Sequence, residues 1–215
     1  MPRTLANSLR WVVEGTRLCE QAVDDLKDQQ YAEPSALPGW TRAHLIAHLA
    51  ANAEALRNLL RWAATGQESP MYSFPEQRNA DIEAGSTRPS AILRTWFHEE
   101  AAALAADLGR LTDAHWAARV RTAQGRDVPA SDIPWLRARE VMVHATDLGT
   151  GFTFADLPKD FLAALHDDIV AKRGSESLPS LEGTVADRVG YLAGRTRAGV
   201  TTADGAPAPE LPPWL

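Results

Sequence analysis

Residues 133–148 read Ile-Pro-Trp-Leu-Arg-Ala-Arg-Glu-Val-Met-Val-His-Ala-Thr-Asp-Leu, and the interpretation of the whole chain depends on this stretch. Helix start signals precede it at Ser131 and Asp132, and Gly149 follows it as a stop signal. Helical spacing gives it a predicted core-facing side that consists of Ile133, Leu136, Glu140, Val143 and His144, with Asp147 on the same side. An acid and a histidine therefore share a face that should otherwise be apolar.

The pair Glu140 and His144 is typical of a metal site. An unpaired carboxylate on a core face is costly, so Glu140 needs a cation. Because the two residues are four positions apart on a helix, their side chains lie on one face, one turn from each other. Both side chains can then bind the same ion.

A third ligand is expected from His48, on a helix predicted to begin near Arg42 and to run to about Thr65. His48 flanks the apolar face of that helix, so in a bundle it points inward. Three protein ligands leave a position open for water or substrate, which is typical of catalytic zinc. Imidazole and carboxylate also bind iron, nickel, manganese and cobalt, so zinc is the default among several divalent metals.

Other interpretations of these residues stay open from spacing alone. His48 taken by itself is typical of a hydrogen-bonded core histidine, and Glu140 has Arg137 and Arg139 as alternative partners. His44, one turn before His48, is expected to lie behind the ligands or to be a polar residue of the first turn, with direct ligation as the alternative. Surface positions are expected for the remaining histidines, His98, His115 and His166, and a core position for Cys19.

The rest of the chain is predicted to be mainly α-helical. Amphipathic patterns predict further long helices over 5–26 and 89–108, so that four long helices form a bundle. A short polar helical stretch falls within 67–87, and a hairpin is predicted from 116–120 and 126–128 around Gln124-Gly125. Two more helices are expected over 158–173 and 184–193, before a proline-rich tail from Thr201 that should be extended or disordered. The predicted domains are therefore a bundle over 1–152 and a small α+β region over 153–215.

Composition narrows the classes of function. The chain has 215 residues and a formal net charge of -6, which argues against a nucleic-acid partner. No apolar run approaches the roughly 18 residues of a membrane span, and the start lacks the pattern of a secretory signal, so a soluble cytoplasmic protein is expected. The one cysteine excludes an intrachain disulfide or a cluster of thiolate ligands.

Several motifs in order resemble the mycothiol-dependent maleylpyruvate isomerases, whose N-terminal half is a DinB-like four-helix bundle. They are Leu37-Pro38-Gly39-Trp40-Thr41, His44, His48-Leu49-Ala50 with Asn52, Trp135-Leu136-Arg137-x-Arg139-Glu140, and His144-Ala145-x-Asp147-Leu148. The resemblance spans residues 1 to about 150. It implies a metal triad at His48, Glu140 and His144, with Asn52 and Asp147 as candidates for supporting these ligands or lining the substrate site.

The resemblance also implies an activity, the conversion of maleylpyruvate to fumarylpyruvate in gentisate catabolism. A thiolate adds to the conjugated cis double bond, the resulting single bond rotates, and elimination gives the trans product. The family takes this thiolate from mycothiol, although glutathione or cysteine remain alternatives for this chain. The implied cation for the substrate carboxylates is Arg195, in Tyr191-Leu192-Ala193-Gly194-Arg195, with Arg197 as the second candidate.

The sequence departs from the family pattern between about Ser175 and Glu182, where a brief Ser, Leu and Pro stretch replaces strand-forming residues. A shortened C-terminal region is therefore expected. This departure leaves two other functions open: a DinB-like thiol S-transferase that conjugates electrophiles, and a non-catalytic metal-binding regulatory module. Oligomeric state is not predicted.

Overall fold

The computed structural model describes residues 3–174, 178–212 and 214, which fall into two compact units. One unit is Thr4–Thr150, and the other comprises Met1–Arg3 and Gly151–Leu215. All three predicted metal ligands lie in the first unit.

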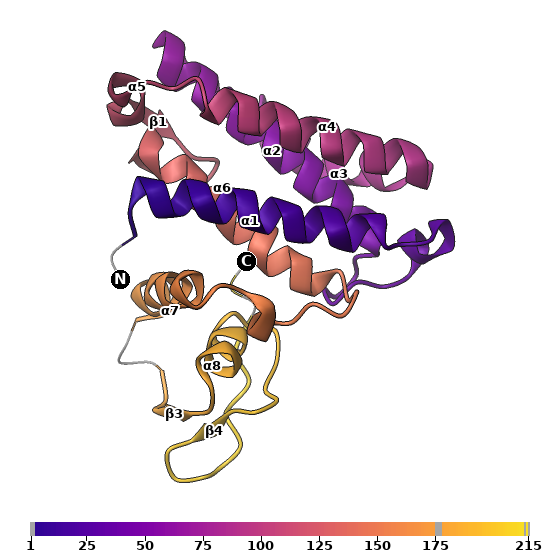
Figure 1. The fold of residues 1–215 in the computed structure, drawn as a ribbon, viewed down its shortest axis with the longest axis vertical. Helices are drawn as coiled ribbons and strands as arrows, with labels where there is room; N and C mark the ends of the chain where they lie inside the picture. Colours follow the sequence, from indigo (N-terminus) through magenta and orange to yellow (C-terminus); the bar gives the residue numbers. More distant parts are fainter. Residues whose placement is uncertain (1–2, 175–177, 213, 215) are drawn as a thin grey trace. The chain divides into compact units, whose positions relative to one another are not determined.

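Four long helices build the first unit (Figure 1). They are α1 (Leu5–Asp24), α2 (Arg42–Thr65), α4 (Ser90–Leu108) and α6 (Ile133–Asp147). Helix α1 packs along α6, α2 packs along α4, and α2 also contacts α6. The predicted bundle is thus formed by the four predicted helices, although α1 ends two residues before the expected Leu26.

The bounds of α2 follow from its caps. The Thr41 hydroxyl accepts a hydrogen bond from the His44 backbone N–H at 3.4 Å, which pairs an otherwise unsatisfied donor of the first turn. At the other end Gly66 has φ of 72°, a left-handed conformation that glycine adopts without strain. Both caps therefore lie at the predicted ends of this helix.

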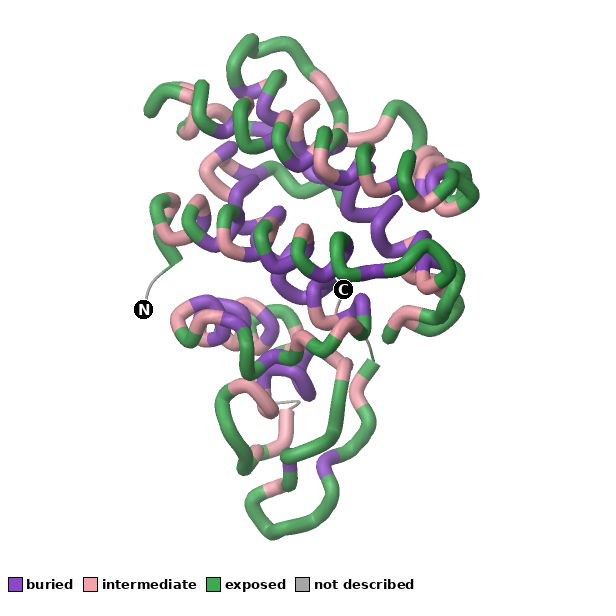
Figure 2. The backbone as a smooth tube through the Cα atoms, turned by 45° about the vertical axis from the view of Figure 1, so that its right-hand side comes forward, coloured by how far each residue is buried: buried purple, intermediate pink, exposed green. Residues whose placement is uncertain are grey.

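Helix α6 is buried on more sides than the sequence pattern indicated. Trp135, Arg137 and Met142 are buried, although none belongs to the predicted core stripe, whereas Leu136 of that stripe is half-buried. Figure 2 shows that the buried residues are concentrated where the long helices face one another. A helix that packs against two neighbours has no solvent face, so its burial does not follow a single stripe.

Short elements connect the long helices of the first unit. They are η1 (Asp28–Ala32), α3 (Gln77–Ser86), α5 (Asp113–Ala117), β1 (Arg119–Arg121), β2 (Asp127–Pro129) and η2 (Ala130–Asp132). The predicted hairpin exists, with Val120 opposite Val128 in an antiparallel pair. Its first strand was placed too early, because Thr112 accepts from the His115 N–H and begins a helical turn through Trp116.

The second unit contains η3 (Phe154–Asp156), α7 (Lys159–Arg173), β3 (Leu181–Glu182), α8 (Val185–Leu192) and β4 (Thr201–Thr202). The predicted tail from Thr201 is extended at its start, where β4 pairs with β3 in an antiparallel ladder. The Tyr191 hydroxyl also donates to the Pro209 carbonyl at 2.7 Å. The stretch predicted to depart from the family pattern covers about 175–182. Residues 175–177 lie outside the described residues, but the stretch ends in strand β3.

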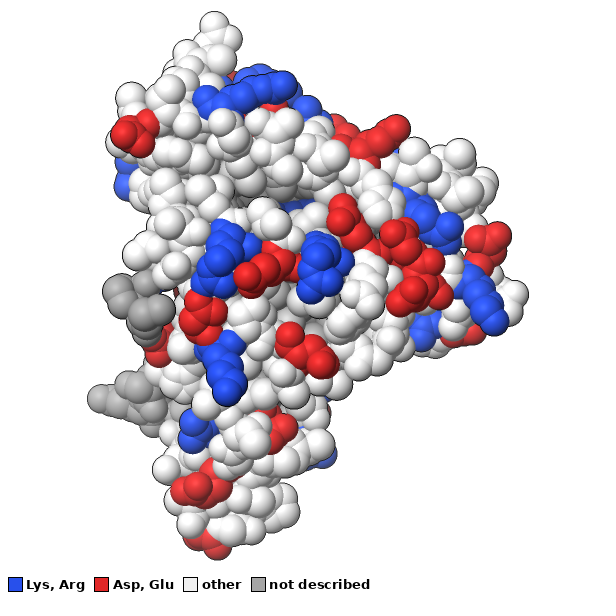
Figure 3. Space-filling model, viewed as in Figure 1, with Lys and Arg blue, Asp and Glu red and all other residues white. Residues whose placement is uncertain are grey.

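Two surface properties bear on possible partners. None of the described helices is both long enough and apolar enough to cross a membrane. On the face in Figure 3, basic and acidic side chains lie next to one another. That face has no continuous basic patch of the kind that binds nucleic-acid phosphates.

Candidate metal centre

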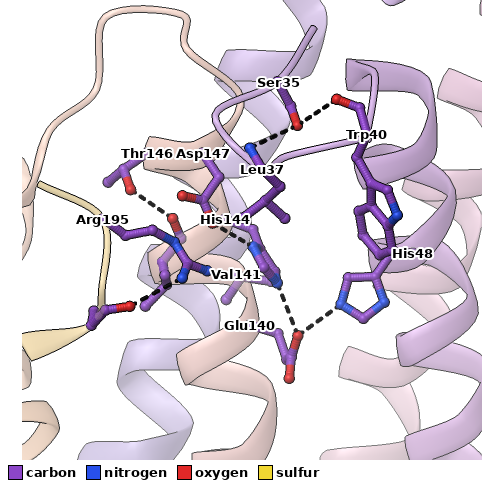
Figure 4. A network of polar contacts seen from close by, with 12 residues as sticks. Ser35, Leu37, Trp40, His48, Glu140, Val141, His144, Thr146, Asp147 and Arg195 are labelled. Atoms are coloured by element: carbon purple, nitrogen blue, oxygen red, sulfur yellow. Dashed lines mark hydrogen bonds and ion pairs between the residues drawn. The ribbon is translucent and has the colours of Figure 1, made fainter. Parts of the chain in front are cut away.

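His48, Glu140 and His144 meet inside the bundle. The Nε2 atom of His48 lies 2.9 Å from Oε2 of Glu140, and Nε2 of His144 lies 3.2 Å from the same oxygen. Figure 4 shows both imidazole rings directed at this carboxylate. Helix α6 supplies two of the side chains and α2 the third, so contact between these helices assembles the group.

The arrangement fits a divalent metal ion. One ligand atom from each residue lies within 4.8 Å of the others. Nitrogen and oxygen ligands at typical zinc distances in a tetrahedral site are about 3.4 Å apart, close to the two measured separations. The histidine side chains are 5% and 4% exposed, but that of Glu140 is 17% exposed. The two histidines are therefore shielded from solvent, while the Glu140 side chain remains partly accessible.

At Glu140 and His48, electrostatics favour the protonation states that a metal requires. Burial raises the pKa of Glu140, but the hydrogen bonds and charges of His144 and His48 outweigh it and hold that pKa well below its usual range. Burial lowers the pKa of His48 by more than Glu140 raises it, so this imidazole is neutral near neutral pH. An ionised carboxylate and a neutral imidazole are both ready to bind a cation.

Asp147 fixes the orientation of His144. Its Oδ2 atom lies 2.8 Å from His144 Nδ1, one turn along α6, and both side chains are buried. Burial lowers the pKa of His144, but its hydrogen bonds to Asp147 and Glu140 raise that pKa overall. A proton on Nδ1, shared with Asp147, leaves Nε2 as the ligand atom, which is the usual partnership of a metal-binding histidine with a carboxylate.

Asn52 lies one turn after His48 and joins the two ligand-bearing helices. Nη1 of Arg137 donates to Asn52 Oδ1 and to the Leu49 carbonyl, both at 2.8 Å. Burial lowers the pKa of Arg137 to about 10, which leaves it charged at neutral pH. Arg137 thus holds α2 against α6 and does not replace the histidines as the partner of Glu140. Asn52 contacts Arg137 behind the triad.

His44 lies apart from the ligand group. Its Nδ1 atom is 2.7 Å from the Thr41 hydroxyl, at the first turn of α2, and its Nε2 atom is 3.6 Å from exposed Glu83. The structure therefore places it as a polar residue of the first turn, one of the two expected positions. The other histidines, His98, His115 and His166, are all partly exposed, and Cys19 is buried.

The two predicted arginines belong to the second unit. Arg195 is half-buried just after α8, and its Nη1 atom donates to the Ala193 carbonyl at 3.0 Å. Arg197 is exposed.

Sequence reasoning missed two side chains next to the triad. The Trp40 ring lies beside His48, with 5.6 Å between ring centroids (Figure 4), and Nη2 of Arg78 on α3 lies 3.4 Å from His48 Nδ1. The position of Trp40 could have indicated this contact, because a residue two positions before a helix lies close to its first turns. Arg78 offered none, because it sits in a polar segment without periodicity.

Comparisons with known proteins identify relatives of the whole chain. Residues 12–149 match the family model described as the mycothiol maleylpyruvate isomerase N-terminal domain. A crystal structure of the mycothiol-dependent maleylpyruvate isomerase is 38% identical, with a TM-score of 0.92 over 100% of this chain and 98% of that chain. A histidine-to-alanine mutant of such an enzyme is 37% identical over the same shares, also with a TM-score of 0.92. The expected shortening of the C-terminal region is not seen relative to these enzymes.

A more distant likeness concerns the fold alone. YfiT from Bacillus subtilis, described as a probable metal-dependent hydrolase with an unusual four-helix bundle topology, is 19% identical over 69% of this chain and 91% of that chain, with a TM-score of 0.55. A search of curated proteins found no match. The family model and the two similar crystal structures confirm both the predicted fold class and the resemblance noted from the motifs. This chain belongs to the mycothiol-dependent maleylpyruvate isomerase family.

Proposed function

We propose that this protein converts maleylpyruvate to fumarylpyruvate with the help of one zinc ion and mycothiol. The observation that carries the proposal is the convergence of His48, Glu140 and His144 on one point of a bundle that matches such an isomerase along its whole length. These three residues would hold the ion. When bound, the ion would lower the pKa of a thiol that coordinates to it, as metals do for thiols and water.

The reaction needs a nucleophile from outside the chain. Maleylpyruvate loses its cis double bond when a thiolate adds to it, and rotation and elimination then return the thiol and give the trans isomer. Cys19 does not serve as this thiolate, because it is fully buried and burial raises its pKa to about 12. A small external thiol meets the requirement, and mycothiol is the one named for the similar enzymes.

Arg195 would serve as the cation of the reaction. Addition of a thiolate places negative charge on the conjugated carbonyl, and a guanidinium stabilises such charge by charge-assisted hydrogen bonds. Replacing Arg195 with Ala should lower kcat while zinc stays bound at one ion per chain. Exposed Arg197→Ala is the matched variant. If Arg197→Ala loses turnover and Arg195→Ala does not, the role belongs to Arg197.

The activity itself can be tested by following maleylpyruvate absorbance with purified, zinc-loaded protein. Conversion is expected with mycothiol, and the same assay with glutathione, with cysteine and without thiol determines which thiol serves. His48→Ala should abolish conversion, whereas His98→Ala, which alters a half-exposed histidine paired with Asp24, should not. A stable thioether product in place of fumarylpyruvate would contradict the isomerase proposal and indicate an S-transferase.

A further inference from the structure

Arg78 on α3 brings a positive charge next to the predicted metal ligands. Its Nη2 atom is 3.4 Å from Nδ1 of His48, and its guanidinium carbon lies 5.9 Å from the centroid of the Trp40 ring. Trp40 in turn lies beside His48. All of these residues belong to the first unit, so the bundle itself holds this cation at the site.

None of the described carboxylates forms an ion pair with Arg78. Its contacts are with neutral groups: the Trp40 ring, the His48 imidazole, the Tyr72 hydroxyl, and Oδ1 of Asn79 at 3.2 Å from Nη1. Within the part of the chain that the structure describes, no carboxylate lies within ion-pair distance of it. Other arginines of this unit do have such partners, for example Arg57, which contacts both Glu100 and Asp107. A half-buried guanidinium without a counter-ion attracts an anionic ligand.

Metal binding would remove one more contact of Arg78, the one to His48. Both histidines direct Nε2 at the shared Glu140 oxygen, so Nε2 of His48 is the ligand atom. A neutral imidazole that binds a metal through Nε2 carries its proton on Nδ1 and no longer accepts a hydrogen bond there. The contact from Arg78 to His48 Nδ1 is then lost, while stacking on Trp40 can keep the guanidinium beside the site.

We propose that Arg78 binds one carboxylate of the dicarboxylate substrate at the metal centre. This inference rests on the proposed function and extends it, because maleylpyruvate carries two carboxylates and one guanidinium pairs with one carboxylate through its two parallel hydrogen bonds. A planar guanidinium matches a carboxylate with two parallel hydrogen bonds, which fixes orientation as well as charge. Arg78 is thus a residue for substrate specificity within the bundle.

Tyr72 supports the same assignment. Burial raises its pKa to about 12 against the opposing charge of Arg78, so its hydroxyl keeps its proton at any physiological pH. A protonated phenol near a guanidinium is a second hydrogen-bond donor for an anion.

The test measures binding of maleate, a stable cis-dicarboxylate, to the zinc-loaded full chain by isothermal titration calorimetry. Arg78→Met should weaken maleate binding about tenfold or more, the usual effect of losing hydrogen bonds to a charged group. Arg78→Lys should restore part of the affinity, since it keeps the charge but loses the planar fork. Arg88→Met is the matched control, because Arg88 also stacks on a tryptophan, Trp96, with 4.1 Å to the ring centroid.

Zinc content and thermal unfolding of each variant show whether the site and the fold are intact. Maleate binding to Arg78→Met at wild-type affinity, or no binding to the wild type, would overturn the proposal. Failure of the isomerase function is a separate result: a wild type that binds maleate through Arg78 but does not convert maleylpyruvate leaves this assignment standing. In the active enzyme, Arg78→Met should raise KM for maleylpyruvate more than it lowers kcat.

Discussion

At the scale of single residues, the metal centre depends on hydrogen bonds behind the ligands. Asp147 contacts the nitrogen of His144 that faces away from Glu140, at 2.8 Å. This contact selects the tautomer and the ring orientation that bring Nε2 to the ion. Because Asp147 is 1% exposed, water cannot easily replace it.

Asp147→Asn should therefore weaken zinc affinity by roughly 10- to 100-fold without removing a ligand. Competition with a chromophoric chelator measures this change. The matched control is Asp167→Asn, which alters the exposed carboxylate next to the partly exposed His166 and should leave zinc affinity unchanged. Equal affinities for Asp147→Asn and the wild type would show that Asp147 does not orient the ligand.

Cys19 gives a second prediction at this scale. Its thiol is buried on α1, donates to the Val141 carbonyl at 2.9 Å, and has a pKa raised to about 12 by burial. Because the raised pKa keeps the thiol protonated, a disulfide reagent at pH 8 should react with it very slowly in the native protein and readily in urea. A fast reaction of Cys19 in the native protein would mean that this part of the bundle opens locally.

At the scale of elements, close contact between α1 and α6 holds the ligand-bearing helix in place. Gly15 faces α6, where an added Cβ would meet Val141 Cγ2 at 2.5 Å and the Met142 backbone nitrogen at 3.3 Å. The glycine thus permits a helix spacing that no larger residue allows. No sequence pattern predicts this close contact, since a glycine within a helical pattern indicates only a weak helix former.

Gly15→Ala should destabilise the protein by about 1 to 3 kcal/mol, the usual cost of overpacking a core. Gly109→Ala is the control, because Gly109 has φ of -70° and its nearest atoms would be 3.6 Å from an added Cβ. That variant should be unchanged or slightly more stable, since alanine restricts the unfolded chain. Urea denaturation of both variants measures the difference, and equal stabilities would mean that α1 and α6 can separate at little cost.

At the scale of the whole molecule, zinc should stabilise the fold, because the ligands come together only when α2 packs on α6. A ligand that binds the folded state at a hundred times its dissociation constant stabilises it by about 2.7 kcal/mol. Zinc should thus raise the melting temperature of the full chain by several degrees, and a chelator should reverse the shift. His98→Ala should retain the shift and His48→Ala should lose it; a shift in His48→Ala would place zinc elsewhere.

The sequence by itself determined most of the helices and the pairing of Glu140 with His144, because caps, spacing and the period of a helix are local properties. It predicted an extended or disordered C-terminal tail but not the pairing of Thr201–Thr202 with Leu181–Glu182, because that pairing depends on residues about twenty positions apart. Only the tertiary structure decided that His48, 92 positions before Glu140, reaches the same carboxylate oxygen as His144, and that Arg78 stands beside it with no counter-ion among the described residues. Such contacts arise from the packing of whole helices, and no local pattern encodes the distance between two side chains on different helices.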